Sequence, residues 1–220
     1  MSEIRKLQYF LNERLKESLP GEKAHLKMVP KPLTEQGTQR PMKPVPGTRK
    51  SSVLVLFFPN ERNEPSLVFT LRTSHINHGG QISFPGGRYE KGETKKETAL
   101  REAREEIGIN TEDIDIAGSL SDLFISVSDN LVTPIIGFID YKPNFRLNPA
   151  EVAEVFTVPI EELGNSNNFV EEEWELQSDA KYNVPFWNIH HVPLWGATAM
   201  ILSELMELYR EFKSQQANDH

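Results

Sequence analysis

The 220-residue chain contains no cysteine, which excludes a disulfide framework and a thiol nucleophile. Redox chemistry therefore does not fix its compartment. Positive charge is also scarce, since 24 Lys and Arg residues stand against 32 Asp and Glu residues, for a formal net charge of −8. A general nucleic-acid-binding protein needs a basic surface that displaces counterions from phosphates, so nucleic acid is not an expected partner. A small anionic substrate that carries a metal ion remains compatible with this charge.

The sequence also lacks an uninterrupted apolar run of the length that a signal peptide or a membrane span needs. Residues 1–19 instead mix charges with apolar residues at helical spacing, which predicts an amphipathic helix; the apolar residues are Leu7, Phe10, Leu11 and Leu15. The last four residues lack a peroxisomal Ser-Lys-Leu address. We therefore expect a cytoplasmic protein with no membrane partner.

At this length one catalytic domain with flanking extensions is expected. Residues 1–50 are predicted to form the N-terminal helix and then, from residue 20, a Pro-rich basic arm that is a linker or is wrapped on the domain. The catalytic domain is predicted at residues 51–213, and a C-terminal tail at residues 214–220.

Hydrophobic runs and breaker residues predict the elements inside this domain. Strands are predicted at residues 52–58, 66–71, 114–120, 131–139, 168–176 and 182–187, and helices at residues 94–107 and 194–212, with a short helix that follows residues 155–159 and ends at Gly164. The turn at residues 60–65 predicts a hairpin, and a Pro/Gly loop is expected at residues 84–92. We term the helix at residues 94–107, which Gly108 would stop, the glutamate helix.

Three carboxylates share one face of the glutamate helix. At ~100° per residue, Glu105 lies about 60° to one side of Glu102, and Glu106 lies about 40° to the other. Like charges at this spacing each destabilise a helix by about 0.2–0.5 kcal/mol, and Glu93 can approach from the preceding loop. Arg101 relieves only part of this repulsion, by pairing with Glu105 one turn further on. The face therefore repels itself unless a cation binds to it.

The type of ligand atom indicates which cation would bind. Carboxylate oxygens with no Cys or His among them suit Mg²⁺ or Mn²⁺ better than Zn²⁺. The alternative is a solvated acidic helix face, which is the commoner explanation of an isolated Glu-Glu pair. The metal site is favoured here because the glutamates belong to a long sequence pattern, which the chain matches with a single departure.

The full pattern runs from a glycine through a glutamate and an Arg-Glu pair to a Glu-Glu pair, a glycine and an aliphatic residue. Its members are Gly87, Glu93, Arg101, Glu102, Glu105, Glu106, Gly108 and Ile109. This pattern resembles the Nudix box, with the small Ala103 at the apolar position as the one departure. The resemblance implies a Nudix hydrolase, which cleaves a nucleoside diphosphate linked to another group and uses Mg²⁺ or Mn²⁺. It also implies the Nudix fold, of class α/β (α+β), in which a mixed sheet lies between helices, and the predicted order of elements suits it.

The resemblance also implies roles for single residues. Glu102, Glu105 and Glu106 match the metal ligands and water activators of the family, and Arg101 matches the arginine that orients them. Pyrophosphate oxygens repel an incoming hydroxide, so the reaction needs cations on the phosphates and a base near the attacking water. We expect catalytic roles for Glu105, Glu106 and Arg101 and metal binding by Glu102, Glu105 and Glu106. The base is either Glu105 or a carboxylate further along the chain, and the sequence leaves both open.

Residues outside the box bear on the substrate. Residues 69–87, 124–134 and 195–200 look like the extended motifs of the coenzyme A pyrophosphatase subgroup, and together the similar regions cover most of residues 52–207. In the first of these, a Thr-x-Arg ending at Arg72 is followed by Gly80, three residues and Phe-Pro-Gly-Gly. The subgroup usually has a basic residue between Arg72 and Gly80. The nearest candidate here is Asn77, in a loop about one residue shorter.

Five residues are candidates for substrate binding: Arg72, His78, Gly86, Gly87 and Arg88. The basic side chains offer charge or donors to an anion, and the glycines permit positive φ and a close turn before the helix. Two alternatives stay open, because Arg72 can instead pair with a core carboxylate and His78 can serve only as a hydrogen-bonding loop residue.

The expected function is therefore hydrolysis of coenzyme A or its derivatives to 3′,5′-ADP and 4′-phosphopantetheine or its acylated form. The alternatives are a Nudix hydrolase of ADP-ribose, NADH or a dinucleoside polyphosphate, and a Nudix-like binding domain without hydrolysis. Such binding domains usually lack some of the box glutamates, and because all of them are present here the binding domain is disfavoured. Fold-level analogy alone suggests a homodimer, with the first helix as a candidate interface. The His190-His191 pair has no second ligand pair at a suitable spacing and predicts only a turn before the last helix.

Overall fold

The computed structural model describes residues 1–33, 43–74, 79–176 and 180–218. The α-helices in these ranges are α1 (Glu3–Arg14), α2 (Glu22–His25), α3 (Lys95–Ile107), α4 (Ile160–Leu163) and α5 (Gly196–Asn218). The strands are β1 (Lys31–Pro32), β2 (Arg49–Pro59), β3 (Pro65–Arg72), β4 (Ile82–Ser83), β5 (Gly86–Arg88), β6 (Asp115–Ser119), β7 (Leu123–Ile125), β8 (Asn130–Phe138), β9 (Val152–Pro159), β10 (Phe169–Leu176) and β11 (Ala180–Trp187).

The strands form two sheets. The larger sheet has the order β4-β3-β2-β8-β6, and β5, β7 and β9 pair with β2, β8 and β3 respectively. Strands β2 and β8 run parallel, whereas the other pairs in this sheet are antiparallel, so the sheet is mixed. The smaller sheet is antiparallel, with the order β1-β11-β10.

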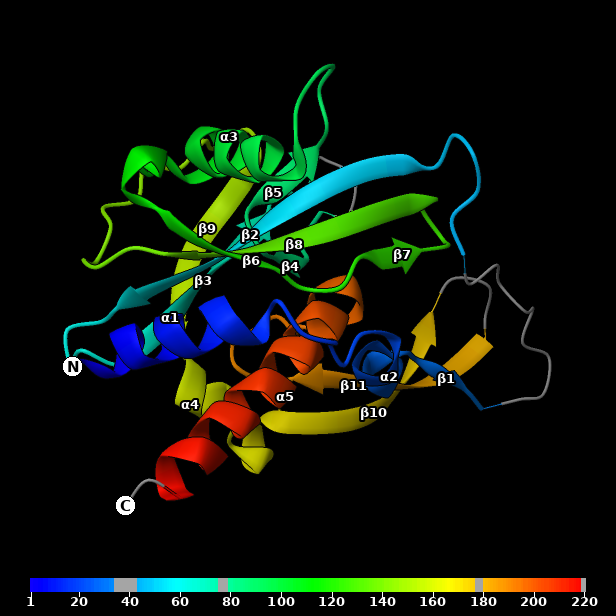
Figure 1. Cartoon of the computed structure of the whole chain (residues 1–220). Helices are drawn as coiled ribbons and strands as arrows, with labels where there is room; N and C mark the ends of the chain where they lie inside the picture. The colour runs from blue at the N-terminus through cyan, green and yellow to red at the C-terminus, as the bar shows by residue number, and fades with distance from the viewer. Residues whose placement is uncertain (34–42, 75–78, 177–179, 219–220) are drawn as a thin grey trace.

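Helices cover both faces of the larger sheet, with α3 on one face and α1 and α5 on the other (Figure 1). Strand β2 shows how the sequence produces two layers, because its side chains alternate between the faces. Leu54, Leu56 and Phe58 lie in the core cluster beneath α3. Val55 and Phe57 lie in the cluster on the other face, which includes residues of α1 and α5. These layers confirm the predicted α/β architecture of a mixed sheet between helices.

Helix α3 has strong signals at both ends. Thr94 is its N-cap, and its side chain accepts from the backbone N–H of Glu97 while the Glu97 side chain accepts from that of Thr94. This reciprocal capping box satisfies two donors that the first turn would otherwise leave free. Gly108 ends the helix at φ 67°, a left-handed conformation that glycine adopts at little cost. The predicted helix boundaries are therefore confirmed to within one residue.

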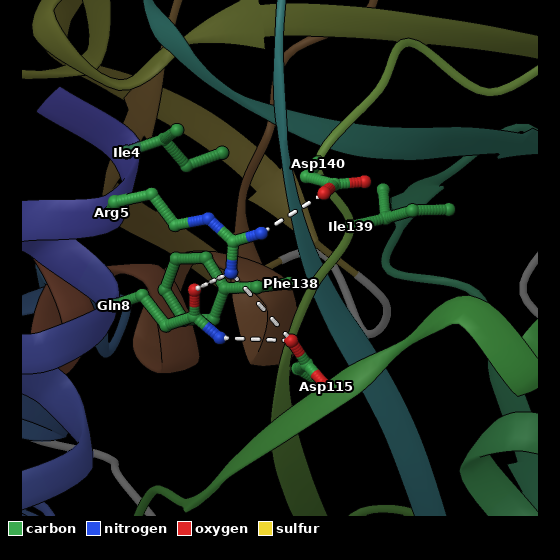
Figure 2. Close-up of a pocket in the computed structure, with 7 residues that line it drawn as sticks. All are labelled: Ile4, Arg5, Gln8, Asp115, Phe138, Ile139 and Asp140. Carbon is green, nitrogen blue, oxygen red and sulfur yellow. Dashed lines mark hydrogen bonds and ion pairs between the residues drawn. The ribbon is translucent and has the colours of Figure 1, made fainter. Parts of the chain in front are cut away.

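The predicted N-terminal helix is present but shorter, and its apolar side packs inward. Ile4, Leu7 and Leu11 are buried in the same cluster as the sheet and α5. Figure 2 shows the polar contacts of the first turn of α1, where Arg5 donates to Asp140 at 2.9 Å and lies 3.8 Å from Asp115. Exposed ion pairs of this kind contribute only about 0–1 kcal/mol, so apolar burial is the main attachment of α1.

The prediction of an irregular arm at residues 20–50 was wrong in part. The segment contains α2, a 3-10 turn at Leu26–Met28, strand β1 and the start of β2, while residues 34–42 lie outside the described ranges. Prolines do not prevent β1, because this strand lies at the edge of its sheet, where a missing N–H is tolerated. The predicted loop at residues 84–92 likewise contains a strand, β5. The domain division at residue 50 stays a prediction. In the described ranges, no helix is both long enough and apolar enough to cross a membrane.

A buried carboxylate fixes the arm to the last helix. The side chain of Glu204 on α5 is fully buried and accepts from Gly21 N at 3.0 Å, His25 Nε2 at 3.1 Å, Ser121 N at 3.2 Å and Ser121 Oγ at 2.6 Å. Burial raises the pKa of Glu204, but the hydrogen bonds from His25, Ser121 and Gly21 together outweigh burial and hold this pKa below its ordinary value. The charged carboxylate therefore joins three separate segments.

Replacing Glu204 by Gln should lower the free energy of unfolding by about 1–3 kcal/mol at pH 7, because the amide nitrogen would face donors and leave a buried group unsatisfied. The folded pKa is depressed, so the stabilisation by the charge is present above the ordinary pKa of 4.5 and is lost as the pH falls through the folded pKa. In urea denaturation, the difference between parent and variant should therefore shrink below about pH 4.5.

The exposed Glu162 on α4 provides the matched control. Glu162→Gln should change the free energy of unfolding by less than about 0.5 kcal/mol, as is usual for surface substitutions. Equal losses in the two variants would contradict the role assigned to Glu204.

Candidate functional site

A cluster of carboxylates lies where α3 meets the start of β9. Glu102, Glu106 and Glu151 each offer an oxygen, and these oxygens all lie within 4.8 Å of one another. Glu102 and Glu106 come from successive turns of α3, and Glu151 directly precedes β9. The segment before Glu151 is held against the helix end, since Asn148 N donates to Glu106 O at 2.9 Å. We refer to these three glutamates as the carboxylate cluster.

Glu106 is the most buried member of the carboxylate cluster, with 1% of its surface exposed. Its Oε2 accepts from the backbone N–H of Gly86 at 3.0 Å, and its Oε1 accepts from Arg72 Nη1 at 3.3 Å. Burial raises the pKa of Glu106 to about 7, although Gly86 and Arg72 act in the opposite direction. Two of the candidate substrate-binding residues, Arg72 and Gly86, therefore contact a candidate metal ligand.

Glu102 depends on a close approach of the backbone at Gly87. A Cβ atom at Gly87 would lie 2.4 Å from Glu102 Cδ and 2.5 Å from either carboxylate oxygen. Of the two glycines expected to have positive φ, Gly86 does and Gly87 does not, so at Gly87 the lack of space for a side chain is the physical reason for glycine. Burial also raises the pKa of Glu102, and Arg101 opposes this shift.

Arg101 joins the glutamates of α3 to the preceding loop. It donates to Glu93 Oε1 at 2.6 Å, Glu102 Oε1 at 2.9 Å, Glu105 Oε2 at 3.1 Å and Arg88 O at 3.0 Å. The hydrogen bond from Arg101 is the largest cause that lowers the pKa of Glu93 to about 2. The expected pairing of Arg101 with Glu105 is present, together with contacts that helical spacing alone did not predict.

The remaining candidates lie around this arrangement. Glu105 does not belong to the carboxylate cluster, and its side chain is 51% exposed. The side chain of Arg88 is also exposed, at the end of β5. His78 and Asn77 lie outside the described residues.

A family comparison agrees with this geometry. The NUDIX domain model matches residues 48–180, which is more than half of the chain. The chain belongs to the NUDIX domain family. The matched span contains β2, the glutamate helix α3 and the whole carboxylate cluster.

Individual relatives extend the match to named enzymes. Nudix hydrolase 3 of Caenorhabditis elegans is 36% identical over 163 residues, which are 65% of this chain and 66% of that protein. Uncharacterized Nudix hydrolase NudL of Pectobacterium atrosepticum is 34% identical over 166 residues, 74% of this chain and 84% of that protein. The crystal structure of the Nudix hydrolase RenU from M. smegmatis has the same fold, with a TM-score of 0.55 at 17% identity, covering 82% of this chain and 94% of that one. The protein is therefore a Nudix hydrolase.

The carboxylate cluster of this Nudix hydrolase fits a hard divalent cation. Its donors are all carboxylate oxygens, which Mg²⁺ and Mn²⁺ prefer. Three carboxylates at this separation repel one another, and burial disfavours their charged forms further. Nudix hydrolases generally need such ions, and a cation bound here would relieve both unfavourable effects.

Sequence reasoning missed Glu151 as a named site residue. It had left open a carboxylate further along the chain as a base, and Glu151 is one of many acidic residues that follow the box. Its place at the carboxylate cluster depends on pairing between β3 and β9, in which Arg72 is opposite Val152. The only local signal was its position directly before a strand.

Replacing Gly87 by Ala should lower metal-dependent turnover about a hundredfold, because the new Cβ would displace the Glu102 carboxylate, and displacements of about 1 Å at a site can have effects of this size. Steady-state assays at saturating Mg²⁺ would measure this loss, and far-UV circular dichroism should remain that of the parent. Gly164, the C-cap of α4, provides the matched control. A Cβ there would lie 3.3 Å from its nearest atom, so Gly164→Ala should keep the parent turnover. Parent-like turnover in Gly87→Ala would refute the packing argument.

Proposed function

We propose that this Nudix hydrolase cleaves the pyrophosphate of coenzyme A or its derivatives, giving 3′,5′-ADP and 4′-phosphopantetheine or its acylated form. The observation that carries the proposal is the motif outside the box, from Thr70 to Gly87, which resembles the coenzyme A pyrophosphatase subgroup. Two parts of that motif meet the carboxylate cluster, since Arg72 and Gly86 both donate to Glu106. Residues typical of a substrate subgroup thus adjoin the carboxylates proposed to bind metal.

We propose Glu102, Glu106 and Glu151 as the ligands of Mg²⁺ or Mn²⁺. When bound, such a cation screens the phosphate oxygens and acidifies the attacking water. Arg101 acts as a positioning residue, because its hydrogen bonds hold Glu102 and also hold Glu93 and the Arg88 carbonyl around the end of β5. The chain thereby presets the carboxylate positions before substrate binds.

Arg72 supplies positive charge at the buried end of the carboxylate cluster. Its Nη1 donates to Glu106, so Arg72 pairs with a buried carboxylate, as one of the two explanations from the sequence expected. A guanidinium has five N–H donors, so this one contact leaves donors for a phosphate oxygen. Arg88 extends into solvent from the neighbouring strand β5 and is proposed to contact the same anion. Both residues would hold the pyrophosphate against the carboxylates.

Two glutamates remain candidates for the base. Glu151 lies within the carboxylate cluster, where a water on a cation would also lie. Glu105 is half-exposed, pairs with Arg101 and does not belong to the carboxylate cluster. We therefore favour Glu151 as the residue that accepts the proton of the attacking water.

The alternatives for the substrate are ADP-ribose, NADH and a dinucleoside polyphosphate, which the absence of the subgroup's usual basic residue near Asn77 keeps open. A binding domain without hydrolysis is disfavoured because every glutamate of the box is present. A homodimer and a cytoplasmic location stay predictions.

A competition assay decides the substrate. The purified protein with Mg²⁺ or Mn²⁺ should convert coenzyme A fastest in an equimolar mixture with ADP-ribose, NADH and diadenosine polyphosphates. Mass spectrometry would detect 3′,5′-ADP and 4′-phosphopantetheine as the products. Faster cleavage of another component would move the substrate assignment while keeping the hydrolase, and no cleavage of any would favour the binding domain.

Glu106→Gln should lower metal-dependent turnover by more than about a hundredfold. Removing a residue that only orients a metal ligand lowers activity by about 10–100-fold, and losing a ligand itself should have a larger effect. The amide keeps the shape of the side chain but lacks the charge that binds a cation. Initial rates over a range of Mg²⁺ concentrations would measure the loss. The exposed Glu112, which precedes β6, gives the matched control, and Glu112→Gln should keep the parent rate.

The same assay compares the two candidate bases, of which Glu151 is also a proposed metal ligand. Glu151→Gln should lower kcat more than Glu105→Gln, because only Glu151 lies in the carboxylate cluster. The opposite order would assign the base to Glu105, and parent-like turnover in Glu106→Gln would remove the proposed metal face altogether.

A further inference from the structure

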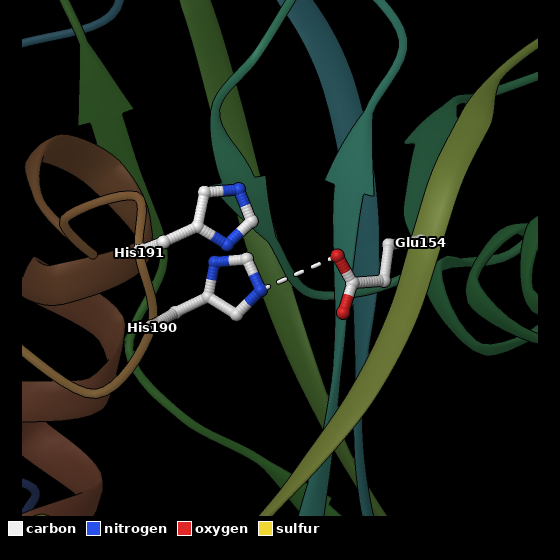
Figure 3. A group of neighbouring side chains, drawn as sticks. All are labelled: Glu154, His190 and His191. Carbon is white, nitrogen blue, oxygen red and sulfur yellow. Dashed lines mark ion pairs between the residues drawn. The ribbon is translucent and has the colours of Figure 1, made fainter.

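A second group of potential metal ligands lies apart from the carboxylate cluster. Figure 3 shows Glu154 of β9 facing His190 and His191, which belong to the segment between β11 and α5. One ligand atom from each residue lies within 4.8 Å of the others, and His190 Nε2 is 3.4 Å from Glu154 Oε2. The sequence suggested no partner for the histidine pair, and Glu154 supplies one because the fold brings β9 to it. We call these three residues the histidine cluster.

The histidine cluster lies on the opposite face of the larger sheet from α3. Val155 packs with the core cluster beneath α3, whereas Phe156 packs with the cluster that contains α5. Side chains alternate along a strand, so Glu154 shares the face of Phe156. The carboxylate cluster is built on α3 itself, so the two groups are separate sites.

The histidine cluster is partly preorganised. The His190 ring stacks on Phe156 with 4.4 Å between ring centroids and 18° between planes, and its side chain is only 10% exposed. The His191 ring lies 4.0 Å from that of His190. Glu154 is 44% exposed and His191 is exposed as well, so an ion in solution can reach these ligands.

We propose that Glu154, His190 and His191 bind a divalent transition-metal ion of the Zn²⁺ type. Two imidazoles and one carboxylate suit this class of ion, whereas Mg²⁺ prefers oxygen ligands alone. Three protein ligands leave a fourth position on a tetrahedral ion for water or another donor. The ion would join β9 to the segment that leads into α5, and so would stabilise the folded chain.

Binding requires a rearrangement that can be observed. His190 Nδ1 accepts from the backbone N–H of Val192 at 3.2 Å, so the proton of the neutral ring is on Nε2, directed at Glu154. If His190 bound the ion through Nε2, the Nε2 proton would be displaced to solvent and Nδ1 would take up a proton, so the ring would keep one proton in both states. Nδ1 can then no longer accept, so Val192 must turn away. Trp195 follows three residues later and is in edge contact with Trp174, so its fluorescence should report the change.

The test uses the full chain with Glu102→Gln and Glu106→Gln as the parent, so that the carboxylate cluster does not compete. Zn²⁺ is titrated against a chromophoric chelator, and tryptophan fluorescence and thermal stability are recorded with the metal alone. One equivalent should bind, with a fluorescence change and a raised Tm, and a large excess of Mg²⁺ should not displace it. Glu154→Gln and His191→Ala should each weaken Zn²⁺ binding by more than about tenfold. Removing a residue that only orients a metal ligand already weakens binding by about this much.

The exposed Glu175 on β10 provides the matched control, and Glu175→Gln should bind Zn²⁺ as the parent does. Glu154 and His191 both have accessible side chains, so without metal the Tm of each variant should match that of the parent. Failure to bind one equivalent, displacement by Mg²⁺, or unchanged affinity in Glu154→Gln and His191→Ala would overturn the proposal. None of these outcomes depends on which substrate the hydrolase cleaves.

Discussion

Repulsion among carboxylates on and beside α3 is the constraint on which the rest of this site depends. Three glutamates bring oxygens within 4.8 Å of one another, and one of them is almost fully buried. The fold offsets the repulsion with oriented donors, namely two arginines and a backbone N–H. Burial, and to a smaller extent the neighbouring carboxylates, still raise the pKa values of Glu102 and Glu106. The remaining negative potential is what a divalent cation and its phosphate ligand would use.

The two faces of the larger sheet have different roles in this structure. The face under α3 presents the carboxylates, and the small residues Ala99 and Ala103 let this helix lie close to β2. The other face is closed by α5 and by the N-terminal segment, which Glu204 holds through hydrogen bonds from residues far apart in the sequence. Helices α1 and α2 are therefore packed against the rest of the folded chain.

Much of this arrangement was predictable from local sequence. The capping residue Thr94, the stop at Gly108 and the spacing of the glutamates are all signals within one helix, and they predicted α3 closely. Apolar runs likewise predicted the long strands β2, β3, β8, β10 and β11, whereas the eight-residue β9 was missed, because its residues were interpreted only as the segment that leads into α4. Strands β1, β4, β5 and β7 were missed because each has only two or three residues, too few for a periodicity to be recognised.

The missed functional groups share a different physical cause. Glu151 reaches the carboxylate cluster through the pairing of β3 with β9, and Glu154 meets His190 through the packing of β9 against the segment after β11. Neither contact has a signature in local spacing, because the partners are set by tertiary structure. The need for Gly87 is similar, since the atoms that exclude its side chain belong to a residue on the next helix. The substrate is harder to predict for a related reason. The box determines the face that binds the metal, whereas contacts to the rest of the substrate come from loops outside the box.

The parallel pairing of β2 with β8 has a consequence for how the chain folds. Arg49 is opposite Asn130 in this pair, so the strands meet only after a long loop containing α3 has closed, and such non-local pairing is slow to form. Glu151 follows β8 in the chain, whereas Glu102 and Glu106 precede it. The carboxylate cluster is therefore complete only when the β3–β9 pairing that places Glu151 has formed. A divalent ion would recognise the finished sheet more strongly than any earlier intermediate, and so would make the last steps of folding harder to reverse.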